Sequence, residues 1–294
     1  MRQQDQAHDF FQTNASEWQN VAEANTYSVI ENRTLTVLET MKRFRPGSSL
    51  LDVGCGTGQL AVEASRNGWE VTGLDFSKEM IQIARANCVS HETSVEFICS
   101  SIFDVDLKER SFDIVSAQGF IEYISFEQLD SFLEICCEVI KDDGVLALGS
   151  RNRLFNLLSF NEYTELEIDI DTIHDLLHES IILQSSESQE DAINILRNLQ
   201  RTYPQPAQRV TTTINVDIRY QFSPAELLHR VERHGFKVLT LMPVHYHSMP
   251  VSLLHNKRVD EAHREVATFI SRNFISHQQC VPYSSSFLLE ARRV

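Results

Sequence analysis

The stretch that most constrains the fold is LLDVGCGTG, residues 50–58, which places three glycines within five positions directly after an apolar run. Glycine has no Cβ, so a glycine-rich turn lets ligand atoms come close to the backbone. In α/β sheets such a turn lies between a buried strand and a helix, at the sheet edge where ligands bind. We therefore expect a ligand at this loop.

The spacing of the glycines indicates which kind of ligand. A dinucleotide-binding loop reads G-x-G-x-x-G. Here Gly54, Gly56 and Gly58 read G-x-G-x-G, and Gln59 stands where that fingerprint has its last glycine. The Asp52 carboxylate, just before the loop, would repel a phosphate and attract an ammonium group. The pattern disfavours a pyrophosphate and predicts a cationic or zwitterionic ligand.

Residues 49–150 alternate short apolar runs with helical patterns, which predicts a parallel sheet wrapped by helices. The helix after the first strand starts at Gln59, Ser77 can cap the next one, and Ser125 with Gln128 forms a capping box for a third. The expected strands are 48–54, 69–76, 95–99, 112–118 and 144–150, followed by 236–242 and 285–293, with late helices over 223–233 and about 258–273.

The regular pattern is interrupted over residues 151–220, where helical stretches at 171–177 and 191–200 precede an alternating, strand-like stretch at 209–222. A connection of this length is too long for a simple sheet crossover, so we expect an inserted cap or substrate region over the carboxyl edge. The predicted organisation is a helical lid at 1–44, a core formed by 45–150 and 221–294, and the cap at 151–220.

Composition limits the partners. The 294 residues carry 26 Lys and Arg against 41 Asp and Glu, a net charge of −15, which disfavours a nucleic-acid partner. No apolar run is long enough for a membrane span and the N-terminus lacks the apolar core of a signal peptide, so we expect a cytoplasmic protein without a membrane partner. The six cysteines have no metal-ligand spacing and are expected to be reduced.

Ten acidic residues and no Lys or Arg occur between positions 154 and 196. We interpret this segment as a solvated acidic face, with a docking surface for a basic partner as the alternative. His174 and His178 are spaced like a metal-binding pair on a helix, but no third ligand accompanies them. No metal is predicted.

The motifs DVGCGTG (52–58), LDFSKEMI (74–81) and SFDIV with GFIEYI (111–124) resemble those of the class I S-adenosylmethionine-dependent methyltransferases. The resemblance is strong over 45–150 and weak over 220–293. It implies an α/β, Rossmann-like sheet of seven strands, with the last strand antiparallel and helices on both faces. It also implies S-adenosylmethionine as the cofactor.

The resemblance assigns roles to particular residues. Asp52 would orient the cofactor's amino group, the loop would approach its methionine part, and Asp75 would accept hydrogen bonds from both ribose hydroxyls. Phe76 and Met80 would wall the adenine. The cofactor-binding residues that this part of the resemblance implies are Asp52, Gly54, Cys55, Gly56, Gly58, Asp75, Phe76 and Met80.

One position departs from the family pattern. The third strand is followed by Ser100, Ser101 and Ile102, where the family has an Asp that accepts from the adenine amino group. A serine hydroxyl or a backbone carbonyl would replace that Asp, and Ile102 would pack on the ring. Gln118 and Gly119 fall where the family's backbone touches the methionine part.

The segment before the sheet resembles the helical lid of this family, in which an aromatic and a basic residue lie near the cofactor carboxylate. Trp18, Tyr27 and Arg33 are the candidates for these two roles, and plain packing is the alternative for each.

Methyl transfer requires alignment and removal of one proton from the acceptor. His245 and His247 follow the sixth strand and are the candidate general bases, with a structural role as the alternative. Arg151, Asn152 and Arg153 follow the fifth strand and are expected at the same rim. Their stretch weakly resembles one in methyltransferases of bacterial surface-carbohydrate and secondary-metabolite pathways.

The predicted function is S-adenosylmethionine-dependent methyl transfer to a small hydroxylated molecule such as a sugar or a secondary metabolite. O-methylation is favoured over N-methylation of a small amine, because a capped pocket suits an enclosed small molecule. The alternative from another class is a non-catalytic S-adenosylmethionine-binding partner subunit. The oligomeric state is open, with a homodimer among the options.

Overall fold

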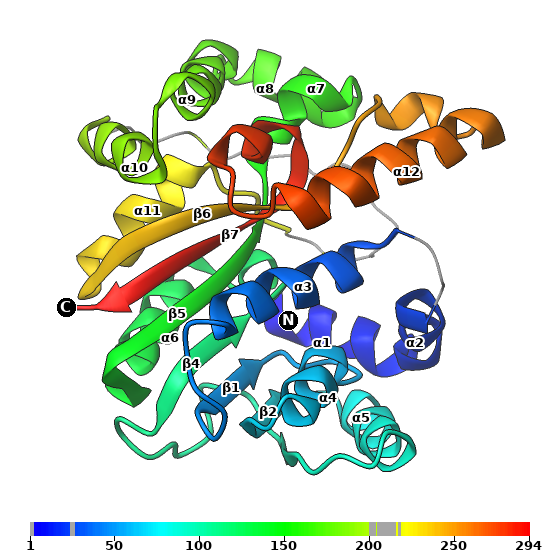
Figure 1. The fold of residues 1–294 in the computed structure, drawn as a ribbon, viewed down its shortest axis with the longest axis vertical. Helices are drawn as coiled ribbons and strands as arrows, with labels where there is room; N and C mark the ends of the chain where they lie inside the picture. Colours follow the sequence, from blue (N-terminus) through cyan, green and yellow to red (C-terminus); the bar gives the residue numbers. More distant parts are fainter. Residues whose placement is uncertain (1–2, 24–26, 200–203, 205–215, 217–218) are drawn as a thin grey trace.

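A computed structural model gives the fold and describes residues 3–23, 27–199, 204, 216 and 219–294. A seven-stranded sheet runs through the molecule in the order β3-β2-β1-β4-β5-β7-β6, with helices on both faces (Figure 1). None of the helices in this described part is long and apolar enough to cross a membrane.

The sheet is parallel except for β7, which runs antiparallel to both β5 and β6. This confirms the predicted fold class, including the reversed last strand. The strands are β1 Ser49–Val53, β2 Glu70–Asp75, β3 Glu96–Cys99, β4 Phe112–Ala117, β5 Ile140–Arg151, β6 Phe236–Tyr246 and β7 Ser284–Arg293. β5 is longer than predicted because it pairs with β4 from Ile140 and with β7 as far as Arg151, and β6 is longer because it pairs with β7 as far as Tyr246.

Successive strand residues point to opposite sides of the sheet, and helices cover both sides, so both faces are buried. On one face Leu50 packs with side chains of α3 (Val29–Met41) and α4 (Gln59–Arg66). On the other face Leu51 joins a larger cluster that includes α6 (Phe126–Val139) and α11 (Pro224–Arg233). Unbroken apolar runs such as residues 144–148 follow from this two-sided burial.

The helix starts follow local capping signals, as predicted. Ser77 Oγ accepts from Met80 N at the start of α5 (Lys78–Ser90), and Ser125 and Ser223 form capping boxes at α6 and α11. α12, Lys257–Asn273, also lies where predicted. The short 3-10 turns are η1 Ile121–Tyr123, η2 Arg153–Phe155, η3 Val251–Leu253 and η4 Gln278–Tyr283.

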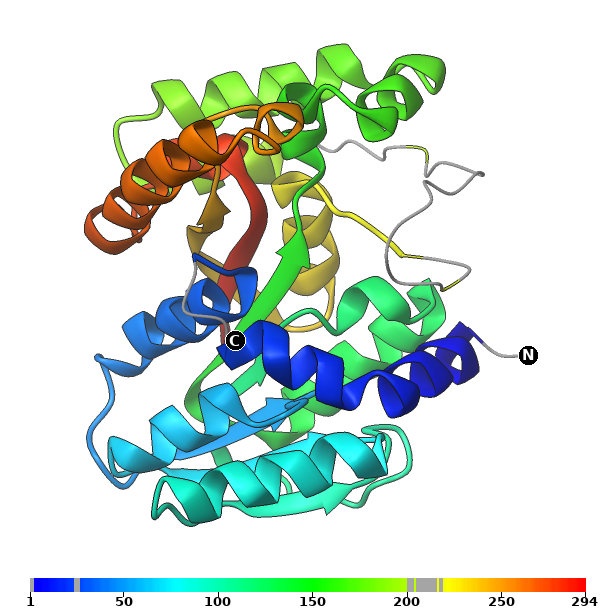
Figure 2. The same cartoon turned by 90° about the vertical axis from the view of Figure 1, so that its right-hand side faces the viewer.

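Three helices precede the sheet. α1 (Gln3–Thr13) and α2 (Ala15–Glu23) pack on α5, whereas α3 contributes Val37 and Met41 to the core beside β6. Figure 2 shows α1 crossing the edge of the sheet near α5. The N-terminal region therefore combines two surface helices with one core helix.

The region between β5 and α11 contains α7 (Asn156–Ser159), α8 (Glu162–Asp169), α9 (Ile173–Ser185) and α10 (Gln189–Asn198). Figures 1 and 2 both place these helices at the β6 end of the sheet, opposite α4 and α5. Leu183 and Leu196 join the large apolar cluster with α11.

The acidic segment is only partly a solvated face. Glu167 is buried and receives the guanidinium of Arg153, whose Nε lies 2.9 Å from Oε1, and buried Glu179 accepts from Ser223 Oγ at 2.7 Å. The strand predicted at 209–222 falls largely outside the described residues. The cap therefore remains a prediction for that part.

Candidate cofactor-binding site

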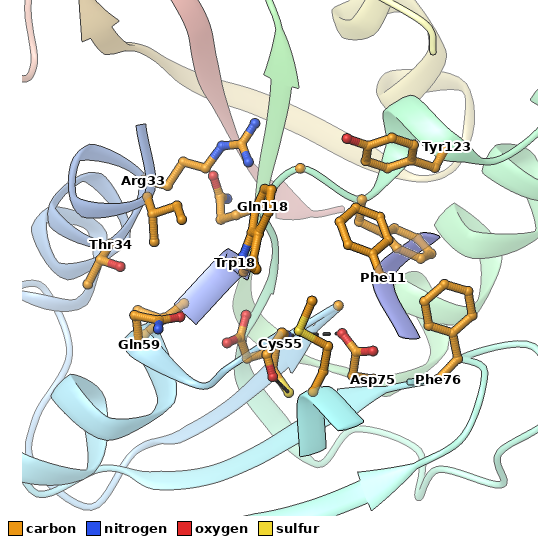
Figure 3. Close-up of a pocket in the computed structure, with 18 residues that line it drawn as sticks. Phe11, Trp18, Arg33, Thr34, Cys55, Gln59, Asp75, Phe76, Gln118 and Tyr123 are labelled. Atoms are coloured by element: carbon orange, nitrogen blue, oxygen red, sulfur yellow. Dashed lines mark hydrogen bonds between the residues drawn. The ribbon is translucent and has the colours of Figure 1, made fainter. Parts of the chain in front are cut away.

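A cavity lies at the carboxyl ends of β1, β2 and β4, under α1, α2 and α3 (Figure 3). β1 pairs with β2 on one side and β4 on the other, so the connections leave in opposite directions there, which is where such sheets bind ligands. Figure 3 labels Phe11, Trp18, Arg33, Thr34, Cys55, Gln59, Asp75, Phe76, Gln118 and Tyr123. The other lining residues are Ile30, Asp52, Gly54, Gly56, Leu60, Met80, Gly119 and Phe120.

The glycine loop forms the floor of the cavity. Gly54 and Gly56 have φ angles of 69° and 53°, which is a left-handed conformation that residues with a Cβ rarely adopt. A Cβ on Gly56 would point to Trp18, 3.9 Å from its Nε1. Gly58 does not line the cavity: a Cβ there would meet Ala84 at 3.0 Å, so this glycine allows α4 and α5 to approach each other.

Two buried carboxylates lie beside the loop. Asp75 Oδ2 accepts from Gly56 N at 3.0 Å, and Oδ1 accepts from Ser77 N at 2.9 Å. Burial raises the pKa of Asp75 to about 6, against the opposing effect of these bonds and of His8. Burial and the neighbouring Asp75 raise the pKa of Asp52 to about 8. Both carboxylates would be stabilised in their charged form by a cationic ligand.

The first two helices close the cavity with aromatic side chains. Phe11 packs edge-on against Trp18 and Tyr123, with ring centroids 5.6 and 5.3 Å apart. Trp18 projects toward the glycine loop, between that loop and Arg33 in the view of Figure 3. Polar contacts hold these helices: Gln19 Oε1 accepts from Gln59 Nε2 at 3.2 Å and from Asn87 Nδ2 at 3.1 Å.

The opposite wall of the cavity carries a buried ion cluster. Arg33 lines the cavity and donates through an Nη to Glu122 Oε1 at 3.2 Å, while Arg219 Nε donates to Oε2 of the same glutamate at 2.7 Å. Glu122 is fully buried, and the arginines hold its pKa below the usual value despite burial.

Gln118 lies next to this cluster, also on the cavity wall. Its Nε2 donates to Ala147 O at 3.0 Å, whereas its buried Oε1 has no hydrogen-bond partner among the described residues. Arg33, Gln118 and Gly119 thus line the same cavity, and their roles at the cofactor remain predictions.

A smaller cavity adjoins the first beyond Asp75. Ser101 and the buried Ile102 line it, together with Phe76. Ser101 Oγ accepts from Phe103 N at 3.3 Å. The residues expected around adenine therefore lie next to those expected around the ribose.

Tyr27, His245 and His247 do not line either cavity. The Tyr27 hydroxyl contacts Tyr246 O at 2.9 Å and Ser271 Oγ at 2.8 Å, and its ring stacks on His245. The predicted roles of Tyr27 at the cofactor and of the histidines in catalysis remain predictions.

The two histidines differ in their surroundings. Asn32 Nδ2 lies 3.3 Å from His245 Nδ1, whereas both ring nitrogens of His247 are buried without a partner in the described part of the chain. Burial is the largest cause of the low pKa of each ring, and it brings that of His247 to about 4. Both rings are neutral at pH 7.

Two of the three residues expected at the rim, Asn152 and Arg153, form hydrogen bonds with other parts of the protein. Asn152 Nδ2 donates to Val281 O and Ser284 O, and Arg153 pairs with Glu167. His174 and His178 are exposed on α9, and the described residues contain no cluster that could hold a metal ion.

Sequence reasoning missed Phe11, Gln59, Tyr123, Glu122 and Arg219. Glu122 lies in the quoted GFIEYI stretch, but its partners Arg33 and Arg219 are far away in the sequence. The only local signal was a charged residue inside an apolar run.

Residues 50–144 match the family model described as a methyltransferase domain. Among curated proteins, the ubiquinone biosynthesis O-methyltransferase of Nitrobacter winogradskyi is 34% identical over 107 residues, which cover 36% of this chain and 40% of that protein. The counterpart from Vibrio atlanticus is 32% identical over 115 residues, covering 39% of this chain and 48% of that one. The matched segment thus spans less than half the length of these relatives.

Among solved structures, magnesium protoporphyrin IX methyltransferase from Synechocystis PCC 6803 with bound S-adenosylhomocysteine matches with a TM-score of 0.57 and 14% identity. The match covers 98% of each chain. At this identity the likeness concerns the fold alone.

Proposed function

Given that this chain carries a methyltransferase domain of the class I, S-adenosylmethionine-dependent family, we propose that it transfers a methyl group from S-adenosylmethionine to a hydroxyl oxygen of a small molecule. The observation that carries the proposal is the pair of buried carboxylates, Asp52 and Asp75, at the glycine loop. A cation bound beside them would favour their charged form, which suits a cofactor that carries an ammonium and a sulfonium group.

The residues of the cavity fit this cofactor. Asp75 would accept hydrogen bonds from the ribose hydroxyls, and Gly54 and Gly56 would allow the cofactor to approach the backbone closely. The unpartnered Gln118 Oε1 can accept a hydrogen bond from an amino group, and Arg33 can receive a carboxylate. The cofactor supplies an electrophilic methyl group on a sulfonium. The chain then has to hold the acceptor in line, exclude water with Phe11 and Trp18, and accept one proton.

Transfer to oxygen is preferred because the curated relatives are named O-methyltransferases. The alternatives are N-methylation of a small amine and cofactor binding without catalysis. The class I fold by itself does not favour either outcome. The cyclase SpnF shares it, with a TM-score of 0.51, 18% identity and coverage of 89% of this chain and 80% of that one.

His247 is the proposed general base. Neither of its ring nitrogens has a partner in the described structure, so the unprotonated one can accept a proton, whereas Nδ1 of His245 is contacted by Asn32. Both rings are stacked, His245 on Tyr27 and His247 on His263. A base whose pKa is about 4 stays unprotonated across the neutral range. The rate at saturating cofactor should then be flat from about pH 6 to 9, and His247→Gln should slow turnover by about 10²-fold to 10⁴-fold.

The experiment is a turnover assay with S-adenosylmethionine and a panel of hydroxylated and amino acceptors, in which S-adenosylhomocysteine formation is measured. Product with a hydroxylated acceptor supports the proposal, and product only with amines supports the N-methyl alternative. Binding of S-adenosylmethionine without any turnover supports the non-catalytic alternative. If His247→Gln turns over at the parental rate, the base lies elsewhere.

A further inference from the structure

The ion cluster beside the cavity contains more positive charge than it neutralises. Three arginines, Arg33, Arg151 and Arg219, surround the single buried carboxylate of Glu122. Glu122 bonds Arg33 and Arg219, so the cluster has a net charge of about +2 if all groups are ionised. This excess is concentrated in a chain whose net charge is −15.

Arg151 is the member of the cluster whose guanidinium has no directly bonded anion among the described residues. No hydrogen bond or ion pair from the described residues reaches its guanidinium, and its Nε is buried with no partner. The guanidinium lies over the ring of Tyr163, with Cζ 5.2 Å from the ring centroid. Burial and the neighbouring Arg219 lower the pKa of Arg151, against the opposing effect of Glu122. Arg151 is half-buried, and Glu122, already bonded to two other arginines, offsets only part of the positive charge of the cluster, so a further anion would be stabilised there.

The position of Arg151 relates it to the acceptor rather than to the cofactor. It is the last residue of β5, and the neighbouring β4 leads to Gln118 and Gly119 on the cavity wall. Among the strands, β1, β2 and the end of β4 supply the expected cofactor residues, so the adjacent end of β5 is the neighbouring position assigned to the second substrate. Arg219 stacks over the cavity residue Tyr123, with Cζ 5.5 Å from the ring centroid.

We propose that Arg151, supported by Arg219, binds an anionic group of the methyl acceptor, so that the substrate is a hydroxylated carboxylate or phosphate rather than a neutral molecule. This inference rests on the proposed function and names its substrate class. Arg33 remains assigned to the cofactor. Glu122 separates the two arginines, because its Oε1 accepts from Arg33 and its Oε2 accepts from Arg219. A guanidinium suits both anions, because it can donate two parallel hydrogen bonds to either.

The test uses protein saturated with S-adenosylhomocysteine, so that the carboxylate subsite of the cofactor is filled. Salicylate and salicylamide, which share a ring and a hydroxyl but differ in charge, are titrated calorimetrically at constant ionic strength. Phenyl phosphate serves as the phosphate probe. We expect one of the two anions to bind about tenfold or more tightly than salicylamide. The tighter of the two identifies the anionic group.

The variants separate binding from structure. Arg151→Met should remove the preference for the anion, Arg151→Lys should retain part of it, and Arg258→Met on the exposed surface of α12 should leave it unchanged. Because Arg151 is unpaired, Arg151→Met should leave the melting temperature of the ligand-free protein unchanged or raise it. A clear drop in that temperature would indicate a structural arginine and overturn the proposal.

If the protein saturated with S-adenosylhomocysteine binds salicylate, phenyl phosphate and salicylamide equally well, the proposed anion site is wrong. It is also wrong if the preference for an anion over salicylamide persists in Arg151→Met. These results would leave the proposed function standing. Failure of S-adenosylhomocysteine to bind would instead overturn the proposed function, and this inference with it.

Discussion

Among single residues, Asp52 and Asp75 matter most for the proposed binding of the cofactor. The pKa of each is raised in the folded protein, to about 8 and about 6. A raised carboxyl pKa contributes stability at low pH, and that contribution is lost as the pH rises through the folded value. Without a ligand, these groups therefore favour the folded state less above about pH 8 than below about pH 4. A cationic ligand acts in the opposite direction.

Binding of S-adenosylmethionine should consequently release protons. At pH 7 Asp52 is largely protonated, because its pKa is about 8, and a cation in the cavity would lower that pKa. We expect a release approaching one proton at pH 7, measured by calorimetry in buffers of different ionisation enthalpy. Asp52→Asn should abolish most of it. Tight binding at pH 7 with no proton release in the parental protein would contradict this assignment.

The residues predicted from the sequence were those with local signals. The glycine loop and Asp75 lie in one strand–helix–strand unit, β1–α4–β2, whose spacing is visible in the chain. The pairing of Glu122 with Arg33 and Arg219 joins residues that only the fold brings together. Tyr27 and His245 form a stacked pair beside α12, a contact that no spacing in the sequence could indicate.

At the scale of elements, alternating apolar runs predicted every strand and its order along the chain, whereas pairing set the strand lengths. β6 continues past Met242 because β7 runs alongside it as far as Tyr246. His245 is thus in the strand, with a φ of 61°, rather than in a loop after it. Strand ends depend on partners that are distant in the sequence, so propensity alone does not fix them.

The predicted lid at 1–44 includes the surface helices α1 and α2, and their removal tests this prediction. Deleting residues 3–23 should leave a folded protein, because α3 keeps its place in the core. Affinity for S-adenosylmethionine should fall by about tenfold or more, since Phe11 and Trp18 leave the cavity. Circular dichroism and calorimetry measure both effects, and Gln19→Ala is the milder companion variant. Parental affinity in the truncated protein would reject the lid.

The inserted helices protect the edge of the sheet. Gln189 Nε2 donates to Leu241 O at 2.8 Å, and its Oε1 accepts from Leu241 N at 3.1 Å, so one side chain satisfies the backbone of β6. Gln189→Ala should lower the free energy of unfolding by about 1–3 kcal/mol in chemical denaturation, with cofactor affinity unchanged. Gln82→Ala, on the exposed face of α5, is the control. Equal stability of the two variants would disprove this role.

At the scale of the whole molecule, charge is distributed unevenly. The surface is acidic, yet the carboxyl edge of the sheet combines two protonatable carboxylates at the glycine loop with an arginine cluster on the opposite wall. A zwitterionic cofactor, positive at the sulfonium and ammonium and negative at the carboxylate, matches both. The acidic residues Glu167 and Glu179 serve packing instead, because each is buried with its partner.

The most direct test of the central claim is a calorimetric titration of the parental protein with S-adenosylmethionine and, separately, with nicotinamide adenine dinucleotide. We expect the protein to bind S-adenosylmethionine and not the dinucleotide. We also expect that Asp75→Ala weakens S-adenosylmethionine binding by about 2–4 kcal/mol, while Asp142→Ala on the surface has no effect. Tight binding of the dinucleotide, or unchanged affinity for S-adenosylmethionine in Asp75→Ala, would contradict the central claim.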